Sequence, residues 1–86
     1  MYKYQIKKSA KKRLLQIPFE YQEKILQEIV NLTFNPFPPG CKKLKRIEGT
    51  PEYSIRVGQY RVVYEVHKDE ILILVVKIGH RKDVYR

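Results

Sequence analysis

The sequence is poor in several residue types, and each shortage excludes a class of protein. Its 86 residues include one cysteine, two histidines, four glycines and no tryptophan. A single cysteine excludes an internal disulfide framework, and so few Cys and His residues cannot build a four-ligand zinc site. The longest apolar run, Ile71 to Val76, is far shorter than the roughly 20 residues that span a bilayer. We therefore expect a soluble cytoplasmic protein, one domain over residues 1–86, with no signal peptide, membrane segment, metal or cofactor.

Acidic residues are also scarce, and the balance of charge is the first positive clue. The chain carries 18 Lys and Arg against 9 Asp and Glu, which leaves a net charge of +9. Such a density favours a polyanionic partner, and it is uneven, because residues 1–17 hold six basic side chains and no acid. The alternative interpretation is that excess lysine only keeps a small protein in solution.

The first part of the chain predicts a short strand followed by two helices. Residues 2–6 alternate with period two, and Ser9 is suited to cap the N-terminus of a first helix. Pro18 favours a tight corner before a second, longer helix, which Asn35 and Pro36 should end. The expected buried faces are Ala10, Leu14 and Ile17 in the first helix and Ile25, Leu26, Ile29 and Leu32 in the second.

The rest of the chain changes to the two-residue period of strands. A basic edge strand is expected around Leu44, and two amphipathic strands are expected over residues 53–57 and 60–67. Gly58 and Gln59 between them predict a type II′ turn, which fixes the register of the hairpin. Arg56 then faces Arg61 across the ladder. The tyrosines at positions 53, 60 and 64 fall on the other face and should be core aromatics covered by the helices.

Ile71 to Val76 is apolar at every position, as in a central strand covered on both faces. If residues 68–70 form a three-residue loop, the odd positions of this strand share the arginine face and Lys77 lies near Arg61. A two-residue loop would instead bury Lys77. The resulting fold class is α+β, with an N-terminal strand and helical hairpin packed on a small, mainly antiparallel β-sheet.

The scattered carboxylates lack the paired arrangement that binds Mg²⁺, so the residues favour chemistry without a metal. RNA supplies its own nucleophile, the 2′-OH, and a protein need only align it, move protons and neutralise the phosphate. Guanidinium groups bind phosphate bidentately, which suits Arg56, Arg61 and Arg81. His80 is a candidate general base or acid, and Tyr85 a partner for the 2′-OH or a base. Solvent-facing arginines without a function are the alternative.

Two stretches give these residues a family context. The segments from Gly58 to Tyr64 and from Gly79 to Tyr85 resemble the RelE branch of the RelE/ParE toxin superfamily, and the similarity extends over nearly the whole chain. This resemblance implies a RelE-like fold and an mRNA interferase. Such a toxin enters the A site of the 70S ribosome and cleaves mRNA by 2′-OH attack, leaving a 2′,3′-cyclic phosphate.

The resemblance also assigns roles to individual residues. Arg61 and Arg81 match the arginines that stabilise the phosphate, and Tyr85 matches the C-terminal tyrosine. Arg56 takes the place of the second of two strand lysines. Ser54 stands at the first lysine position, which is implicated in proton abstraction, and His80 is therefore the substitute candidate for the base.

Partners follow from the same resemblance. It implies an acidic antitoxin encoded beside this chain, in a heterotetramer or a larger complex, in addition to the ribosome and mRNA. A ParE-like inhibitor of DNA gyrase and an inactive basic RNA-binding module are the alternative functions. The expected RNA contacts are Lys7, Lys8, Lys11, Lys12, Arg13, Lys42, Lys43, Lys45, Arg46, Lys77 and Lys82.

Overall fold

The fold follows from a helical hairpin inserted between the first strand and a four-stranded meander. The computed structural model describes residues 1–44, 49–80 and 82. In these ranges, no helix is long and apolar enough to cross a membrane. In chain order the elements are β1 (Lys3–Ile6), α1 (Lys8–Leu14), α2 (Phe19–Phe34), β2 (Lys42–Leu44), β3 (Glu52–Val57), β4 (Tyr60–His67) and β5 (Leu72–His80).

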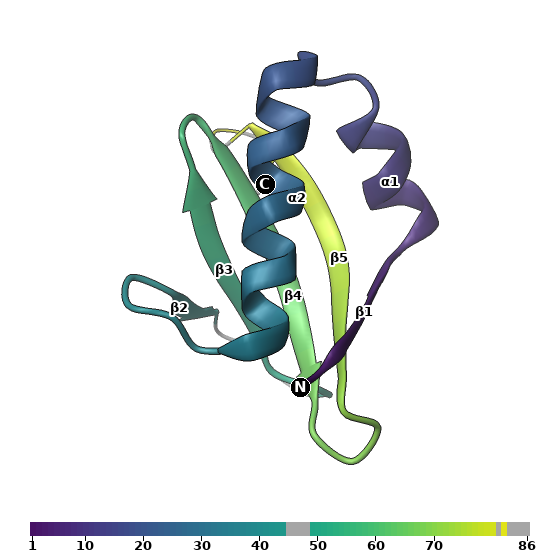
Figure 1. The fold of residues 1–86 in the computed structure, drawn as a ribbon, viewed down its shortest axis with the longest axis vertical. Helices are drawn as coiled ribbons and strands as arrows, with labels where there is room; N and C mark the ends of the chain where they lie inside the picture. The colour runs from purple at the N-terminus through teal and green to yellow at the C-terminus, as the bar shows by residue number, and fades with distance from the viewer. Residues whose placement is uncertain (45–48, 81, 83–86) are drawn as a thin grey trace.

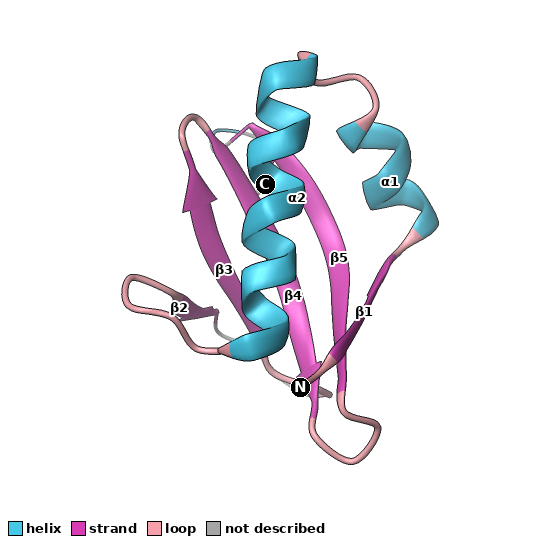
Figure 2. Ribbon diagram, viewed as in Figure 1, coloured by secondary structure: helices cyan, strands magenta, loops and turns pink. Residues whose placement is uncertain are grey.

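The strands form one sheet with the spatial order β1-β5-β4-β3-β2. β1 runs parallel to β5, while the other neighbours are antiparallel. Both helices lie on the same face of this sheet, as Figures 1 and 2 show. The predicted α+β class and mainly antiparallel sheet are confirmed. One face of the sheet is covered by α1 and α2, and we call the other face, which neither of these helices covers, the open face (Figures 1 and 2).

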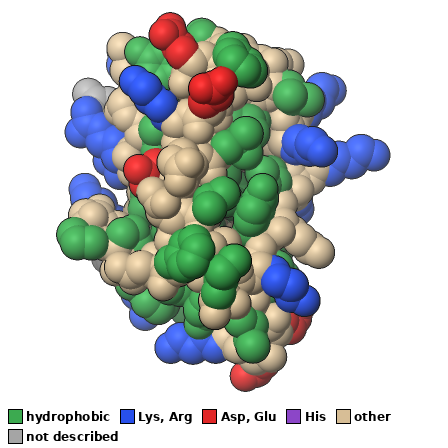
Figure 3. All heavy atoms as spheres, in the orientation of Figure 1, with side chains coloured by type: hydrophobic (Ala, Val, Ile, Leu, Met, Phe, Trp, Pro, Cys, Tyr) green, Lys and Arg blue, Asp and Glu red, His purple; other side chains and the backbone are tan. Residues whose placement is uncertain are grey.

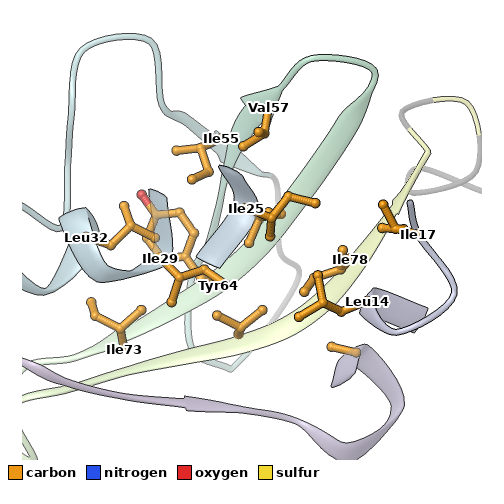
Figure 4. Packing of buried hydrophobic residues seen from close by; sticks show 13 residues of the cluster. Leu14, Ile17, Ile25, Ile29, Leu32, Ile55, Val57, Tyr64, Ile73 and Ile78 are labelled. Carbon is orange, nitrogen blue, oxygen red and sulfur yellow. The ribbon is translucent and has the colours of Figure 1, made fainter. Parts of the chain in front are cut away.

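The core lies between α2 and the helix-covered face. Ile25, Ile29 and Leu32, spaced by one turn of α2, are almost completely buried, and they meet Tyr64 and Ile73 from the sheet (Figure 4). The predicted stripe of Ala10, Leu14 and Ile17 is also buried and joins the same cluster. A helix that lies on a sheet needs only such a one-sided stripe, so the opposite side of each helix is free to be polar.

The start of α1 differs from the sequence prediction. Ser9 is not the N-cap, because α1 begins at Lys8 and Lys7 precedes it without a side-chain cap. The reason lies in the sheet: the Lys7 N–H donates to the Val75 carbonyl at 2.8 Å, which ends the pairing of β1. The Lys7 carbonyl then accepts the N–H of Lys11 at 2.9 Å, so the helix starts as soon as the strand ends.

The boundaries of α2 agree with the prediction from Pro18 and Asn35. Pro18 precedes the helix, and Asn35 ends it in an extended conformation. Gln22 donates a side-chain hydrogen bond of 2.7 Å to the carbonyl of Ile17, which satisfies the backbone at the corner between the helices. Beyond Asn35, the hydroxyl of Tyr64 donates to the Pro36 carbonyl at 2.7 Å and ties the connector to the sheet.

The predicted β3–β4 register is confirmed pair by pair, from Val57 opposite Tyr60 to Tyr53 opposite Tyr64, with Arg56 opposite Arg61. Gly58 has φ +61°, and Ile71 is the only non-glycine residue with positive φ among the described residues. Gln59 therefore has negative φ, which agrees with a type II′ turn and not with type I′.

β5 corrects two expectations. The strand begins at Leu72, because residues 68–71 form the loop and Ile71 is exposed in it with φ 52°. The odd positions do not share one face: Ile73 and Val75 are fully buried against the helices. A bulge follows, because Val63 pairs with Lys77 whereas Tyr64 pairs with Val75. The extra residue turns Lys77 to the open face.

The two helices cover only one face of the apolar run of β5 (Figure 2). Leu72 and Leu74 alternate with the buried residues and are half-buried on the open face of the sheet. Neither helix reaches this face (Figure 2).

Candidate nucleic-acid interface

The arginine pair lies at the turn end of the open face. Arg56 and Arg61 are directly paired across the β3–β4 ladder, with Arg56 exposed and Arg61 half-buried. The Arg56 Nε donates to the Gly58 carbonyl at 3.1 Å, so the turn itself holds one guanidinium in place. Like charges placed in this way cost about 0.2–1 kcal/mol. A bound anion would remove that cost.

Gly79 occupies the next position in the same row. It pairs with Arg61 on the side of β4 away from Arg56. Gly79 is buried, so this row holds two cations and a buried glycine at the turn end of the open face.

A second row of side chains runs next to the arginines. Lys42, Ser54, Val63 and Lys77 are paired in sequence across β2, β3, β4 and β5. The two lysines at the ends are exposed, whereas Ser54 and Val63 between them are buried. This row is two residues from the arginine row, about 7 Å away. We call the four cations Arg56, Arg61, Lys42 and Lys77 the cationic face.

The opposite end of the open face is acidic. Glu52 is paired with Glu65 across the same hairpin. His67 Nε2 lies 2.7 Å from Glu65 Oε1, with both side chains partly exposed. Along β3 and β4, the open face therefore carries cations near the β3–β4 turn and carboxylates toward the other end. An anionic chain is attracted to the turn end.

His80 does not lie with the arginines. It pairs with Tyr60, whose side chain is on the helix-covered face, and the two rings meet edge to face at 6.1 Å. Its Nδ1 accepts the backbone N–H of Lys82 at 3.3 Å. Tyr60 in turn contacts Tyr21 of α2, with 5.3 Å between ring centroids. The structure thus separates His80 from Arg56 and Arg61 by the thickness of the sheet.

The remaining predicted residues lie on several surfaces. The basic side chains of α1 and of its entry are exposed on the helix side, where Figure 3 shows basic residues gathered over α1. Lys43 is exposed but pairs with Tyr53 on the face opposite to Lys42. Lys82 is exposed just after β5. The basic residues on the helix side are Lys7, Lys8, Lys11, Lys12 and Arg13. Arg81, Tyr85, Lys45 and Arg46 lie outside the described residues.

Sequence reasoning missed one member of this grouping. Lys42 was predicted only as an RNA contact, whereas Lys77 was expected near Arg61 if residues 68–70 formed a three-residue loop, and both lysines share the face of the arginine pair. The pairing of Lys42 with Ser54 required a β2–β3 register that no turn motif signals, and Lys77 required the bulge. In contrast, Tyr64 is a core residue as predicted, and burial raises the pKa of its hydroxyl, with a further contribution from the neighbouring Cys41.

Comparison with known proteins places this geometry in a family. A family model that describes the ParE toxin of type II toxin-antitoxin systems matches residues 4–85. The chain belongs to this toxin family. The match includes both segments that carry the resemblance to the RelE/ParE superfamily.

Individual relatives of this toxin are named as RelE proteins. Toxin RelE1 of Methanocaldococcus jannaschii is 34% identical over 83 residues, which are 95% of this chain and 92% of the relative. The RelE–RelB complex of Pyrococcus horikoshii contains a chain with a TM-score of 0.82 and 27% identity, covering 96% of this chain and 98% of that one. The isolated RelE toxin of Escherichia coli, at 21% identity, has a TM-score of 0.79 and coverages of 99% and 92%, and it supports the fold.

Proposed function

We propose that this toxin is an endoribonuclease that cleaves mRNA in the A site of the 70S ribosome. The observation that carries the proposal is the cationic face, in which two directly opposed arginines are flanked by lysines at the positive end of an open sheet. Relatives named as RelE toxins support the same class of activity.

The proposed reaction is an internal transfer of the phosphate. The 2′-oxygen attacks the neighbouring phosphorus and loses its proton to a base, the bond from phosphorus to the 5′-oxygen breaks, and that oxygen gains a proton. The products are a 2′,3′-cyclic phosphate and a 5′-hydroxyl. Arg56 and Arg61 stabilise the charge that develops on the phosphate, with Arg81 as a third guanidinium. No step uses a metal or a cofactor.

Tyr85, His80 and Lys77 are given separate roles around the reacting phosphate. Tyr85 is proposed to contact the 2′-OH, as the resemblance implies. The side of the sheet on which His80 lies, beside Tyr60, favours a contact with a neighbouring nucleotide over proton transfer at a phosphate held by Arg56 and Arg61. Lys77, which shares their face, adds positive charge near the same phosphate.

The arrangement of charge supports a requirement for the ribosome. The basic side chains of α1 are exposed on the helix side, whereas the cationic face is on the opposite side of the sheet. A single RNA strand that lies on the cationic face does not reach the lysines of α1. A folded RNA that surrounds the protein reaches both surfaces, and the salt-dependent contacts of these lysines would supply binding energy while the cationic face holds the substrate.

An acidic antitoxin encoded next to this toxin is the proposed inhibitor. The relative from Pyrococcus horikoshii is a RelE–RelB complex, and a net charge of +9 favours an acidic partner. A disordered acidic segment that folds on binding would cover the cationic face, in a heterotetramer or a larger assembly in the cytoplasm. Its association rate should fall as salt rises, because attraction between opposite charges is screened over about 8 Å at physiological ionic strength.

The test is cleavage of a defined mRNA by purified toxin with and without 70S ribosomes. We expect primer extension to show cuts within the A-site codon, and mass spectrometry of the fragments to show a 2′,3′-cyclic phosphate. The same mRNA without ribosomes should be cut far more slowly. Products with a 5′-phosphate would contradict 2′-OH attack. Inhibition of gyrase supercoiling without mRNA cleavage would support the ParE-like function instead.

A further inference from the structure

A cleft of about 360 Å³ lies between α1 and the C-terminal half of β5. It exists because β1 pairs with β5 only as far as Val75 and the chain then turns into α1. Beyond that point, no strand in the described part of the chain pairs with β5 on this side. The side chain of Ala10 is small and Gly79 has none, so helix and strand do not fill the space. The walls are Ser9, Ala10 and Arg13 of α1 and residues 76–79 of β5.

The lining combines an apolar wall with two cations. Ala10 and Val76 present hydrocarbon, whereas Arg13 and Lys77 are exposed basic side chains from the two sides and Ser9 supplies a hydroxyl. A volume of this size falls in the range of small-ligand sites, about 300–1,000 Å³. A purely apolar ligand would gain nothing from the cations, and inorganic phosphate would leave the apolar wall uncovered. A nucleotide matches both, with its base on the apolar wall and its phosphate between the cations.

The cleft adjoins the cationic face. Gly79 lines the cleft and is the direct partner of Arg61, while Lys77 lines the cleft and lies in the adjacent row of the open face. One strand spacing, about 4.8 Å, separates β5 from β4. An RNA strand whose phosphate is held by Arg61 therefore needs to advance by only one nucleotide across β5 to enter the cleft.

We propose that this cleft is a subsite for one nucleotide of the RNA, next to the phosphate that is cleaved. The proposal rests on the ribonuclease function proposed above. It assigns Arg13 to the phosphate of the bound nucleotide rather than to ribosomal RNA, and it gives Lys77 a contact with the same phosphate.

The test measures nucleotide binding directly, by ¹H–¹⁵N chemical-shift titration of the full chain. The protein carries Arg56→Ala and Arg61→Ala, which remove the neighbouring anion site and leave the cleft intact. The probes are adenosine 5′-monophosphate, adenosine and inorganic phosphate. We expect the monophosphate to shift the amides of Ser9, Ala10 and residues 76–79, and to bind at least about tenfold more tightly than either fragment.

Two variants and a matched control locate the phosphate. Arg13→Gln and Lys77→Gln should each weaken binding of the monophosphate about tenfold, the expected loss of one charge-assisted contact at a partly exposed site. Lys68→Gln removes the same charge from the β4–β5 loop, at the other end of the molecule, and should change nothing (Figure 1). Equal weakening by Lys68→Gln, or equal binding of inorganic phosphate and the monophosphate, would refute the subsite.

This experiment is independent of cleavage. If the monophosphate binds in the cleft but the wild-type toxin cuts no mRNA on ribosomes, the ribonuclease proposal fails while the nucleotide site stands. If the toxin cuts mRNA but the amides lining the cleft do not shift, the subsite is wrong and the ribonuclease function is unaffected.

Discussion

Replacing Arg61 by alanine should separate activity from stability in this protein. Arg61 is paired with Arg56 on one side and Gly79 on the other, at the centre of the row that we assign to the phosphate. Removing one preorganised charge from such a site typically reduces the rate by about 10²–10³. Cleavage of ribosome-bound mRNA by Arg61→Ala should fall by that factor.

The free energy of unfolding should change little. Loss of the cross-strand repulsion with Arg56 stabilises the variant by about 0.2–1 kcal/mol. Loss of packing by the half-buried stem opposes this, at about 0.8 kcal/mol for each CH₂ group that is fully buried. Because these two effects have opposite sign, we expect a net change within about 1 kcal/mol, or a shift in melting temperature below about 8 °C.

The assay pairs mRNA cleavage on 70S ribosomes with urea unfolding at low and high salt. Salt should stabilise the wild type more than Arg61→Ala, because screening relieves the repulsion with Arg56 only where both charges are present. Lys68→Ala is the charge-matched control, and it should retain full cleavage. Arg61→Lys keeps the charge but loses the two parallel donors, so its rate should lie between the wild type and alanine. The reasoning would be refuted if Arg61→Ala cleaved mRNA at the wild-type rate, or if it lost cleavage because the variant was unfolded.

Three further substitutions and one control test the fold and the site. Tyr64→Phe removes the 2.7 Å hydrogen bond to the Pro36 carbonyl and should cost about 0.5–1.5 kcal/mol in urea unfolding. Because burial raises the pKa of Tyr64 in the folded state, its contribution is complete below about pH 10 and is lost at higher pH, and the phenylalanine variant should lose less stability there. Gly58→Ala should cost about 1–2 kcal/mol because φ is +61°, whereas Gln59→Ala in the same turn should be nearly neutral, as measured by thermal unfolding. His80→Gln should slow cleavage by less than the arginine variant above, and a loss of 10² or more would return the role of base to His80.

Helices and the hairpin were predictable because their signals are local. Pro18 and Asn35 set the two ends of α2 through their own backbone geometry, and the apolar stripe of each helix repeats within that helix. Gly58 set the turn, and the alternation on either side then determined every β3–β4 pair, including Arg56 opposite Arg61. The arginine pair of the site was thus readable before any tertiary contact was known.

Features that depend on pairing between distant segments of the chain could not be predicted from local sequence signals. Ser9 suits a helix cap by type, but the hydrogen bond from Lys7 to Val75 decided where α1 begins. Lys77 was expected to share the arginine face if residues 68–70 formed a three-residue loop, and to be buried if the loop had two residues. It does share that face, but through the bulge, because the extra residue beside Val63 reverses the alternation of β5.

The sequence by itself determined the elements of this toxin, the register of its central hairpin and the opposition of two arginines, because each depends on residues close together in the chain. Only the tertiary structure decided which lysines share the face of the arginine pair, on which side His80 lies, and where a cleft remains beside β5. The physical reason is that side chains alternate between the two faces of a strand, so a shift of one residue moves each of them to the other face. The strands and helices that pack against the strand determine whether such a shift occurs.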